Sequence, residues 1–390
     1  MKISLPALSD DERQHSERLT SRIAQEIERG AGWISFERYM EMALYEPGLG
    51  YYSAGARKLG AEGDFVTAPE ISPLFSRCLA RQSAEVLAAL GGGNILELGA
   101  GSGVMAADLL SELAVMESLP HRYYILEISA DLRVRQQALI ESRIPQLRER
   151  VVWLDALPEN FTGMVLANEV LDAIPVQRFR MRGEQVNALG IAWRLGKLEE
   201  SEVRADVPLQ EAVRAVEAAI GHPLPDDYES EINLRIPAWI ASLAELLARG
   251  VILLIDYGLP RTQYYSADRS RGTLLCHYRH RFHSNPLINV GLQDIGAWVD
   301  FTCVAEAAVD AGLSVAGFCT QTHFLIGCGI EKLLADLAQR DLSDRLHLAR
   351  QAITLTLPGE MGERFKVIGL TKTYDAALSG FSVRDLAGSL

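Results

Sequence analysis

The chain has 390 residues, of which 48% are hydrophobic and 23% charged, so it can form one large globular domain with insertions or two domains. Its net charge of −13 argues against a general nucleic-acid-binding protein, because such proteins need a basic surface to contact phosphates. The five cysteines are scattered and no pair has C-x-x-C spacing, so we predict neither a disulfide framework nor a metal site.

No apolar run approaches the roughly 20 residues that a membrane-spanning helix needs. The first residues contain an acidic patch and lack the long apolar segment of a secretory signal. We therefore predict a cytoplasmic protein of a bacterium that is not inserted into a membrane.

The first 90 residues predict a helical N-terminal extension and a lid. Residues 10–30 carry apolar side chains at helical spacing among charges, and residues 72–90 form another helix that three consecutive glycines should end. The stretch just before this second helix is polar and rich in turn formers. It is either a connecting loop or a segment that folds over the mouth of a ligand site and contributes Asp64, Thr67 and Glu70.

A strand, a glycine turn and a helix follow in residues 94–108. The short apolar run N-I-L-E-L is long enough for one buried parallel strand. Gly99, Gly101 and Gly103 follow at alternate positions, and a helical pattern begins at Val104. This succession is typical of the first half of a nucleotide-binding unit.

The details of this turn restrict the class of ligand that it can bind. The third glycine comes one residue too early for the dinucleotide fingerprint G-x-G-x-x-G, in which a helix N-terminus binds a pyrophosphate. Glu97, just before the turn, would repel a pyrophosphate but suits a cationic ligand. S-adenosylmethionine carries a sulfonium and an ammonium but no phosphate, and E-x-G-x-G-x-G after a strand is its usual signature. We therefore predict that Glu97 and the three glycines bind its methionine end. A dinucleotide site and a glycine turn without a ligand are the alternatives.

Two acidic residues follow the next two predicted strands. Glu127 ends the strand at 123–128, where an acid can bind both ribose hydroxyls of an adenosine. Asp155 follows the strand at 151–154, where an acid commonly meets the adenine amino group. The alternatives are a solvated strand-end carboxylate for Glu127 and a helix cap for Asp155.

The fourth strand, at 163–168, runs into a polar segment that we assign to the acceptor. Ligands bind at the carboxyl ends of the strands in this architecture, so Asn168 should lie close to the donor methyl. Glu169 and Asp172 are three residues apart and would share one face if a helical turn starts there, as a carboxylate pair that grips a cationic acceptor. The alternative is a pair of acids that merely complements a helix dipole.

The alternation of strands and helices is then interrupted twice. Residues from about 176 to 250 are typical of a hairpin followed by two helices, inserted before a clear buried strand at 251–255. A second insertion spans about 259–302. Strands at 314–320 and 365–371 complete the sheet, with a helical stretch at 331–352 between them. Substrate-specific parts of a protein usually lie in such insertions.

Seven segments of the chain occur in the order of one known family. They are G-D-F-V-T-A-P-E-I-S, E-L-G-A-G-S-G, A-N-E-V-L-D-A-I-P, I-D-Y-G, R-G-T-L-L-C-H-Y-R-H, V-D-F-T and F-K-V-I-G-L. Over residues from about 36 to 372 the chain resembles the MidA-type methyltransferases, bacterial and mitochondrial relatives of an assembly factor of respiratory complex I. The first and third segments are far more specific than the glycine turn, which alone indicates only the superfamily.

The resemblance implies an α/β fold with a Rossmann-like sheet of seven strands. A helical extension at residues 1–90 precedes a core at 91–390 that carries the two insertions. The implied reaction is methyl transfer from S-adenosyl-L-methionine to a protein arginine, giving symmetric dimethylarginine on a core subunit of complex I or a similar protein. Glu169 and Asp172 would hold the guanidinium in a forked geometry, with Asn168 near the methyl group. Self-association into a homodimer is left open.

Two positions depart from the family pattern. Ala100 and Ser102 stand where the relatives often have proline and arginine, a change that keeps the glycines and should not abolish donor binding. Trp298 replaces a histidine before V-D-F, so the acceptor would differ here if that histidine touches substrate. Two other functions stay open: a small-molecule methyltransferase on the same fold, and a donor-binding assembly factor without turnover.

Overall fold

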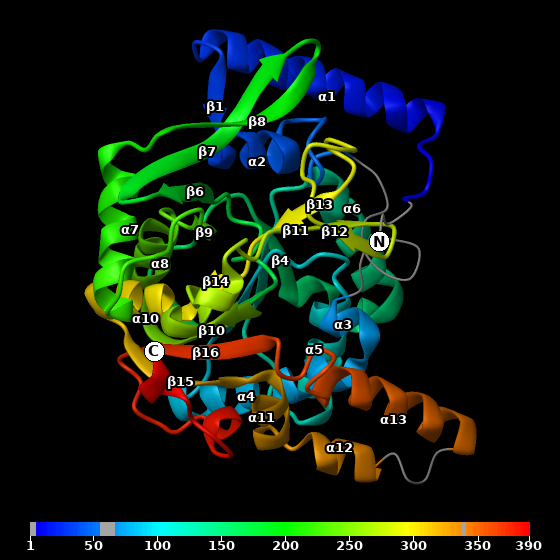
Figure 1. Ribbon diagram of the computed structural model, residues 1–390. Helices are drawn as coiled ribbons and strands as arrows, with labels where there is room; N and C mark the ends of the chain where they lie inside the picture. Colours follow the sequence, from blue (N-terminus) through cyan, green and yellow to red (C-terminus); the bar gives the residue numbers. More distant parts are fainter. Residues whose placement is uncertain (1–4, 55–66, 337–340) are drawn as a thin grey trace. The chain divides into compact units, whose positions relative to one another are not determined.

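The computed structural model describes residues 5–54, 67–336 and 341–390 (Figure 1). The chain divides into two compact units. Unit 1 consists of Met1–Phe65, Leu171–Ile236 and Leu259–Asp300. Unit 2 consists of Val66–Val170, Pro237–Gly258 and Phe301–Leu390. Each unit therefore combines three stretches of the chain that are far apart in sequence.

Unit 2 contains the predicted sheet. The strands that unit 2 contributes to it are β2 (Asn94–Leu98), β3 (Tyr123–Leu126), β4 (Val151–Leu154), β5 (Phe161–Asn168), β10 (Leu247–Leu259), β15 (Ser314–Thr320) and β16 (Phe365–Lys372). They lie in the order β15-β16-β10-β5-β2-β3-β4. The strands from β10 to β4 are parallel, whereas β16 is antiparallel to both β10 and β15. The predicted α/β fold class is confirmed.

The strands of this sheet form because their apolar runs are continuous. β10 is buried at every position from Val251 to Ile255, and β2 is buried from Ile95 to Leu98. A parallel strand in the middle of a sheet is covered on both faces, so it needs such a run rather than an alternating pattern. These strands and the helices packed on them share one large hydrophobic core.

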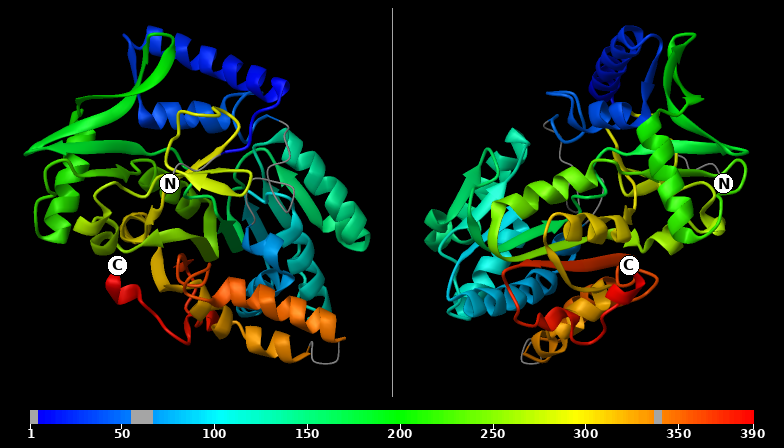
Figure 2. Two further views of the ribbon diagram at one scale, coloured as in Figure 1. Left: turned by 45° about the vertical axis from the view of Figure 1, so that its right-hand side comes forward. Right: turned by 90° about the vertical axis from the view of Figure 1, so that its left-hand side faces the viewer.

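Helices connect the strands of unit 2. They are α3 (Ala68–Ile71), α4 (Pro73–Leu90), α5 (Val104–Val115), α6 (Ala130–Arg143), α8 (Ile236–Leu246), α10 (Phe301–Asp310), α11 (Gln321–Gly327), α12 (Ile330–Asp336) and α13 (Leu342–Thr356), with 3-10 turns at Pro145–Arg150, Ser379–Phe381 and Ala387–Ser389. The side chain of Ser72 caps α4, and Gly91 ends it in a left-handed conformation with φ +76°. α11 packs against α12 and α13, the orange helices of Figure 2.

Unit 1 is built around a second, antiparallel sheet. Its elements are α1 (Asp10–Arg29), β1 (Trp33–Ser35), α2 (Phe36–Tyr45), β6 (Gln177–Arg182), β7 (Gln185–Arg194), β8 (Lys197–Arg204), α7 (Val207–Ile220), β9 (Glu229–Ile232), α9 (Arg261–Tyr264), a 3-10 turn at Ala267–Arg269, β11 (Leu275–Tyr278), β12 (Arg281–His283), β13 (Asp294–Gly296) and β14 (Val299–Asp300). Five strands follow the order β1-β7-β6-β9, with β8 paired to β7. The predicted hairpin is thus present as β6 and β7, and β12-β11-β13 form a small separate sheet.

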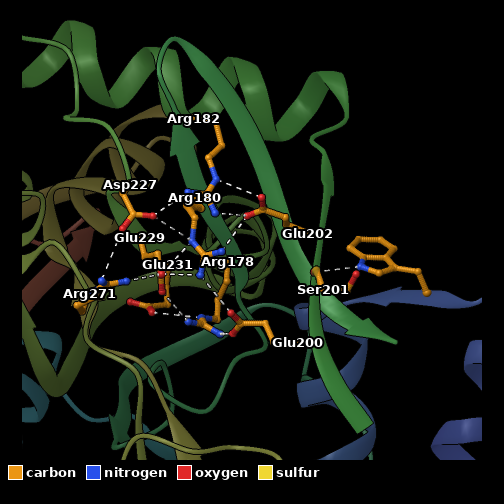
Figure 3. Close-up of polar contacts among 11 residues, drawn as sticks. Arg178, Arg180, Arg182, Glu200, Ser201, Glu202, Asp227, Glu229, Glu231 and Arg271 are labelled. Carbon is orange, nitrogen blue, oxygen red and sulfur yellow. Dashed lines mark hydrogen bonds and ion pairs between the residues drawn. The ribbon is translucent and has the colours of Figure 1, made fainter. Parts of the chain in front are cut away.

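The two faces of the five-stranded sheet differ in chemistry. Phe179 and Met181 on β6 join a hydrophobic cluster with Leu209 and Val213 of α7. The alternate positions of β6 carry arginines, which point toward carboxylates of β8 and β9 (Figure 3). The strand period of two therefore separates an apolar face from a charged one.

Two local predictions need correction, and one helix was not predicted. The second helix predicted in the insertion at about 176–250 ends at Leu246, because the chain enters the sheet at Leu247, which pairs with Phe161 of β5. The helical stretch at 331–352 is two helices, α12 and α13. Helix α11 was not predicted from the sequence. It begins at Gln321, directly after β15 ends at Thr320, so no turn residues mark its start. Among the helices of the described ranges, none is long and apolar enough to cross a membrane.

Candidate functional site

The register of the parallel strands places the predicted donor residues in one row. Leu98 of β2 pairs with Leu126 of β3 and with Ala167 of β5, and Leu126 pairs with Leu154 of β4. The residues that follow these four are Gly99, Glu127, Asn168 and Asp155. The carboxyl ends of parallel strands meet at one edge, where ligands bind in open α/β sheets. The structure therefore brings these four predicted residues to one sheet edge.

The glycine turn adopts a backbone that favours glycine. Gly99, Gly101 and Gly103 all have positive φ, at +66°, +54° and +85°. A Cβ at Gly99 would also lie 3.2 Å from Cγ2 of Val170, and Gly103 is the N-cap of α5. Three left-handed residues in five form a tight turn at the end of β2, a cradle that a side chain would strain.

Helix α3 is tied to this turn. Ser102 donates a hydrogen bond from its hydroxyl to the Glu70 carboxylate, and the Ser102 Oγ accepts from the backbone N–H of Val104 at 3.3 Å. Glu70 thus contacts the glycine turn, while Thr67 is the N-cap residue of α3. Asp64, the third residue assigned to the lid, lies outside the described residues.

Glu127 is a buried carboxylate held by two donors. Its Oε1 accepts from the backbone N–H of Ser129 at 2.9 Å, and its Oε2 accepts from Nε2 of Gln136 at 3.0 Å. Burial raises the pKa of Glu127, and the two hydrogen bonds and nearby Arg133 partly oppose that rise. Each oxygen keeps a further lone pair, so the carboxylate can still accept from two ribose hydroxyls.

Glu97 is more enclosed than a ligand-contacting carboxylate would require. It lies within β2, is 1% exposed, and its Oε2 accepts a hydrogen bond from the Tyr123 hydroxyl at 2.7 Å. Burial raises the pKa of Glu97 to about 7, helped by the Glu127 charge and opposed by the Tyr123 hydrogen bond. The assignment of Glu97 to the methionine end of the donor stays a prediction.

Asp155 and Ile128, a neighbour of Glu127 that we did not predict as a site residue, are both exposed to solvent. The Asp155 side chain is 89% exposed and forms an ion pair with Arg133 of α6 at 2.5 Å. Ile128 directly follows Glu127 and is 75% exposed. An exposed apolar side chain beside the acid that we predict to bind the ribose could offer a surface to an adenine ring. The apolar residue after the strand-end acid is the sequence signal that could have identified it.

Asn168 and Glu169 form a constrained pair at the end of β5. Glu169 has φ +54°, which is uncommon for a residue with a side chain, and its N–H donates to the Ile255 carbonyl at 2.9 Å. The Asn168 amide Nδ2 donates to the Glu169 carboxylate at 3.1 Å. Asn168 Oδ1 is buried without a hydrogen-bond partner among the described residues. Backbone strain and an unsatisfied buried oxygen together are typical of a functional site.

Asp256 supports this pair from β10. It is fully buried, and its carboxylate accepts from the N–H groups of Val170 at 3.2 Å and Tyr257 at 2.8 Å. The Val170 contact holds the backbone just beyond Glu169.

The helical turn assumed for Glu169 and Asp172 does not form. The left-handed Glu169 breaks any helix, the Leu171 carbonyl accepts from the Ile174 N–H in a simple turn, and Pro175 disfavours a helical Ile174. Asp172 belongs to unit 1, where its carbonyl accepts from the Ala297 N–H at 3.1 Å. The spacing argument for one shared face was therefore wrong, while the two residues' roles stay predictions.

The residues of unit 2 fit an adenosyl sulfonium. The left-handed glycine cradle, the buried Glu127 and the orphaned Asn168 oxygen lie at one strand edge, and this set offers acceptors but no cluster of basic residues for a pyrophosphate. Within residues 5–54, 67–336 and 341–390, no group of three or more His, Cys, Asp or Glu is arranged to hold a metal ion.

Comparison with known proteins agrees with this geometry. Residues 78–319 match the model of a family of S-adenosyl-L-methionine-dependent methyltransferases. A crystal structure of a Burkholderia thailandensis protein bound to S-adenosyl-homocysteine is 39% identical, covers 99% of this chain and 100% of its own, and superposes with a TM-score of 0.95. A native crystal structure from the same organism is 40% identical with the same coverage and a TM-score of 0.92.

Curated relatives extend the similarity to eukaryotes. The mitochondrial protein arginine methyltransferase NDUFAF7 of Danio rerio is 29% identical over 380 residues, which cover 88% of this chain and 84% of the relative. The homologue of Drosophila melanogaster is 28% identical over 87% of this chain and 82% of its own. Because the family model spans more than half of the chain, the protein belongs to the S-adenosyl-L-methionine-dependent methyltransferases of the MidA type, with S-adenosyl-L-methionine as its donor.

Proposed function

We propose that this methyltransferase acts on a protein arginine and forms symmetric dimethylarginine on a core subunit of respiratory complex I or a similar protein. The proposal is supported by the relatives that are named protein arginine methyltransferases and match over more than four-fifths of their length. We place the reaction in the bacterial cytoplasm, with the substrate protein as the main partner, and keep the homodimer as part of the proposal.

The observation that carries the proposal is the carboxylate of Glu169 on a strained, left-handed backbone. A guanidinium is always charged and delocalised, so an enzyme that methylates it must orient one nitrogen and balance its charge. Glu169 stands at the strand end where a donor methyl group would face the acceptor, and its left-handed backbone is held by the Ile255 carbonyl. A carboxylate fixed in this way can receive a guanidinium without losing further freedom.

The donor, when bound, supplies an electrophilic methyl group on a positively charged sulfur. In an in-line transfer, a guanidinium nitrogen forms a bond to the methyl carbon while the sulfur keeps the electron pair of the broken bond. The nitrogen then loses a proton to a carboxylate or to water. We assign Glu169 and Asp172 to binding the guanidinium, and Asn168 to orienting Glu169 through their hydrogen bond of 3.1 Å.

The donor residues follow from the same row of strand ends. We assign Glu97, Gly99, Gly101 and Gly103 to the methionine end, Glu127 to the ribose and Asp155 to the adenine. Thr67, Glu70 and Asp64 are assigned to a segment over the donor. The contact between Glu70 and Ser102 of the glycine turn supports the Glu70 assignment.

Incubation of the protein with isotope-labelled S-adenosyl-L-methionine and bacterial lysate tests the acceptor. We expect label on a protein band, and mass spectrometry of its peptides should find dimethylarginine. Label only in small molecules would favour a metabolite methyltransferase instead. Donor binding without any label transfer would favour an assembly factor without turnover. A catalytically impaired Glu169→Gln protein serves as the matched control.

A further inference from the structure

One side chain of α6 connects three parts of the donor site. Gln136 is fully buried, and its Nε2 donates to the Gly101 carbonyl at 2.9 Å and to Glu127 Oε2 at 3.0 Å. Its Oε1 accepts from the indole Nε1 of Trp153 on β4 at 2.9 Å. Gln136 therefore links the glycine turn, the acid after β3 and the neighbouring strand. No pattern in the sequence around it signals such a role.

Chemistry determines the direction of the Gln136 amide. The Trp153 indole N–H can only donate, so it must face the amide oxygen. The two hydrogens of the amide nitrogen then meet the Gly101 carbonyl and the Glu127 carboxylate, which only accept. A reversed amide would place its nitrogen against the Trp153 N–H, donor against donor. Its oxygen would then meet the Gly101 carbonyl and the Glu127 carboxylate, acceptor against acceptor. Trp153 thus keeps Gln136 aimed at the donor site.

The third glycine of the turn packs against the same residue. A Cβ at Gly103 would lie 3.3 Å from both Cα and Cγ of Gln136, and the Gly103 φ is +85°. Gly103 is the glycine that comes too early for a dinucleotide fingerprint. Its position is explained by close contact with α6 at Gln136, because any side chain would push the turn away from that helix.

We propose that Gln136 is a positioning residue that holds the Glu127 carboxylate and the glycine turn in the geometry that receives S-adenosyl-L-methionine. The proposal rests on the assignment of Glu127 to the ribose. A carboxylate that is already oriented loses less conformational freedom when the ribose hydroxyls bind. Preorganisation of Glu127 therefore increases the affinity for the donor. Gln136 itself would touch only the protein.

The same hydrogen bond favours the charged form of Glu127. Burial raises the Glu127 pKa, and hydrogen bonds from Ser129, Gln136 and the Ile128 backbone, together with nearby Arg133, lower it. The Glu127 charge in turn raises the pKa of Glu97. A protonated Glu127 is a poorer acceptor for ribose hydroxyls. Loss of the Gln136 donor should therefore raise the Glu127 pKa, and donor affinity should begin to fall at a higher pH.

The test compares Gln136→Met with Gln137→Met, its exposed neighbour on the same helix. Calorimetry would measure binding of S-adenosyl-L-methionine and S-adenosyl-homocysteine between pH 5 and 9, below the melting temperature of each protein. We expect Gln136→Met to bind both at least about tenfold more weakly and to lose affinity at a higher pH than wild type. Gln137→Met should match wild type within about twofold. A purely structural role would lower thermal stability and leave the pH profile unmoved, which would overturn the proposal.

Two further variants separate the possible failures. Trp153→Phe keeps Gln136 but removes the donor that orients it, and it should weaken binding by less than Gln136→Met. If Gln136→Met does not fold, wild-type affinity and pH profile in Trp153→Phe would overturn the proposal. Glu127→Ala tests the ribose assignment by itself. Unchanged binding in Glu127→Ala refutes that assignment, whereas impaired Glu127→Ala with unchanged Gln136→Met refutes only the role of Gln136.

Discussion

At the scale of single residues, the most informative position is the strained Glu169. A left-handed conformation costs a residue with a side chain about 1–2 kcal/mol, so surrounding contacts must hold it. Here the Ile255 carbonyl binds its N–H, the Asn168 amide binds its carboxylate, and Asp256 fixes the next residue. A strained backbone that three contacts hold in place indicates that the position of the Glu169 side chain is needed for function, at a cost in folding stability.

We predict that Glu169→Gln lowers kcat by roughly a hundredfold and leaves the Kd of S-adenosyl-L-methionine within about twofold of wild type. The amide keeps the shape but loses the charge that balances a guanidinium. Methylation of the acceptor and calorimetry of donor binding measure the two effects separately. Glu159→Gln, at an exposed loop position of the same unit, is the control. Wild-type turnover in Glu169→Gln would remove Glu169 from the mechanism.

Glu97 gives a prediction about pH. Burial raises its pKa from the ordinary 4.5 to about 7, so the folded protein binds the proton more tightly than the unfolded chain. The stability that this group contributes is complete below pH 4.5 and is lost as the pH rises through 7. Glu97→Gln removes this loss, so its free energy of unfolding should rise relative to wild type between pH 5 and 8, by up to a few kcal/mol.

Urea unfolding at pH 5 and pH 8 measures that difference for Glu97→Gln and for Glu141→Gln, an exposed control on α6. The glutamine retains an oxygen that accepts from the Tyr123 hydroxyl, so the change isolates the titration. An effect of Glu97→Gln that is the same at both pH values would contradict the buried-acid explanation.

At the scale of elements, strand β6 of unit 1 carries two kinds of ion pair on the charged face of its sheet, one buried and one exposed. Arg178 is 10% exposed and binds Glu200 at 2.6 Å and Glu229 at 3.5 Å, with Glu231 at 3.7 Å (Figure 3). Arg182, four residues along β6, is 43% exposed and pairs with Glu202 at 3.1 Å. Arg178 is therefore the partner of the buried Glu231, whereas Arg182 forms its ion pair at the surface.

We predict that Arg178→Met destabilises the protein by about 3–5 kcal/mol, because it removes the arginine that pairs with the buried Glu231. Glu229 keeps its ion pairs with Arg180 and Arg271. Arg182→Met removes a partner at the surface and should cost much less. Urea unfolding at neutral pH compares the two variants on the same strand. Equal losses would show that burial does not decide the strength of these pairs.

At the scale of the whole molecule, donor binding is linked to stability. A ligand that binds only the folded protein at 100 times its Kd adds about 2.7 kcal/mol to the free energy of unfolding. We predict that S-adenosyl-L-methionine and S-adenosyl-homocysteine both raise the melting temperature. Glu127→Ala should lose most of this shift at the same ligand concentration. A shift of wild-type size in Glu127→Ala would contradict the ribose assignment.

The local elements of unit 2 could be predicted because their signals are short in sequence. The apolar run at 314–320 coincides with β15, and the glycine turn with the helix after it lies where the motif places it. Residues that gain their role from packing had no such signal. Gln136 on α6 is linked to Gly101, Glu127 and Trp153 only when the fold brings them together.

The strand ends, the glycines and the acids that follow them could be predicted from the sequence, since each depends on a continuous stretch of chain. The family and the donor followed from those stretches. Three features became apparent only in the folded chain: Glu169 is left-handed, no helix joins it to Asp172, and Glu97 is enclosed with Tyr123. These outcomes depend on contacts with Ile255 and other residues far along the chain, where burial and backbone hydrogen bonds outweigh local preference.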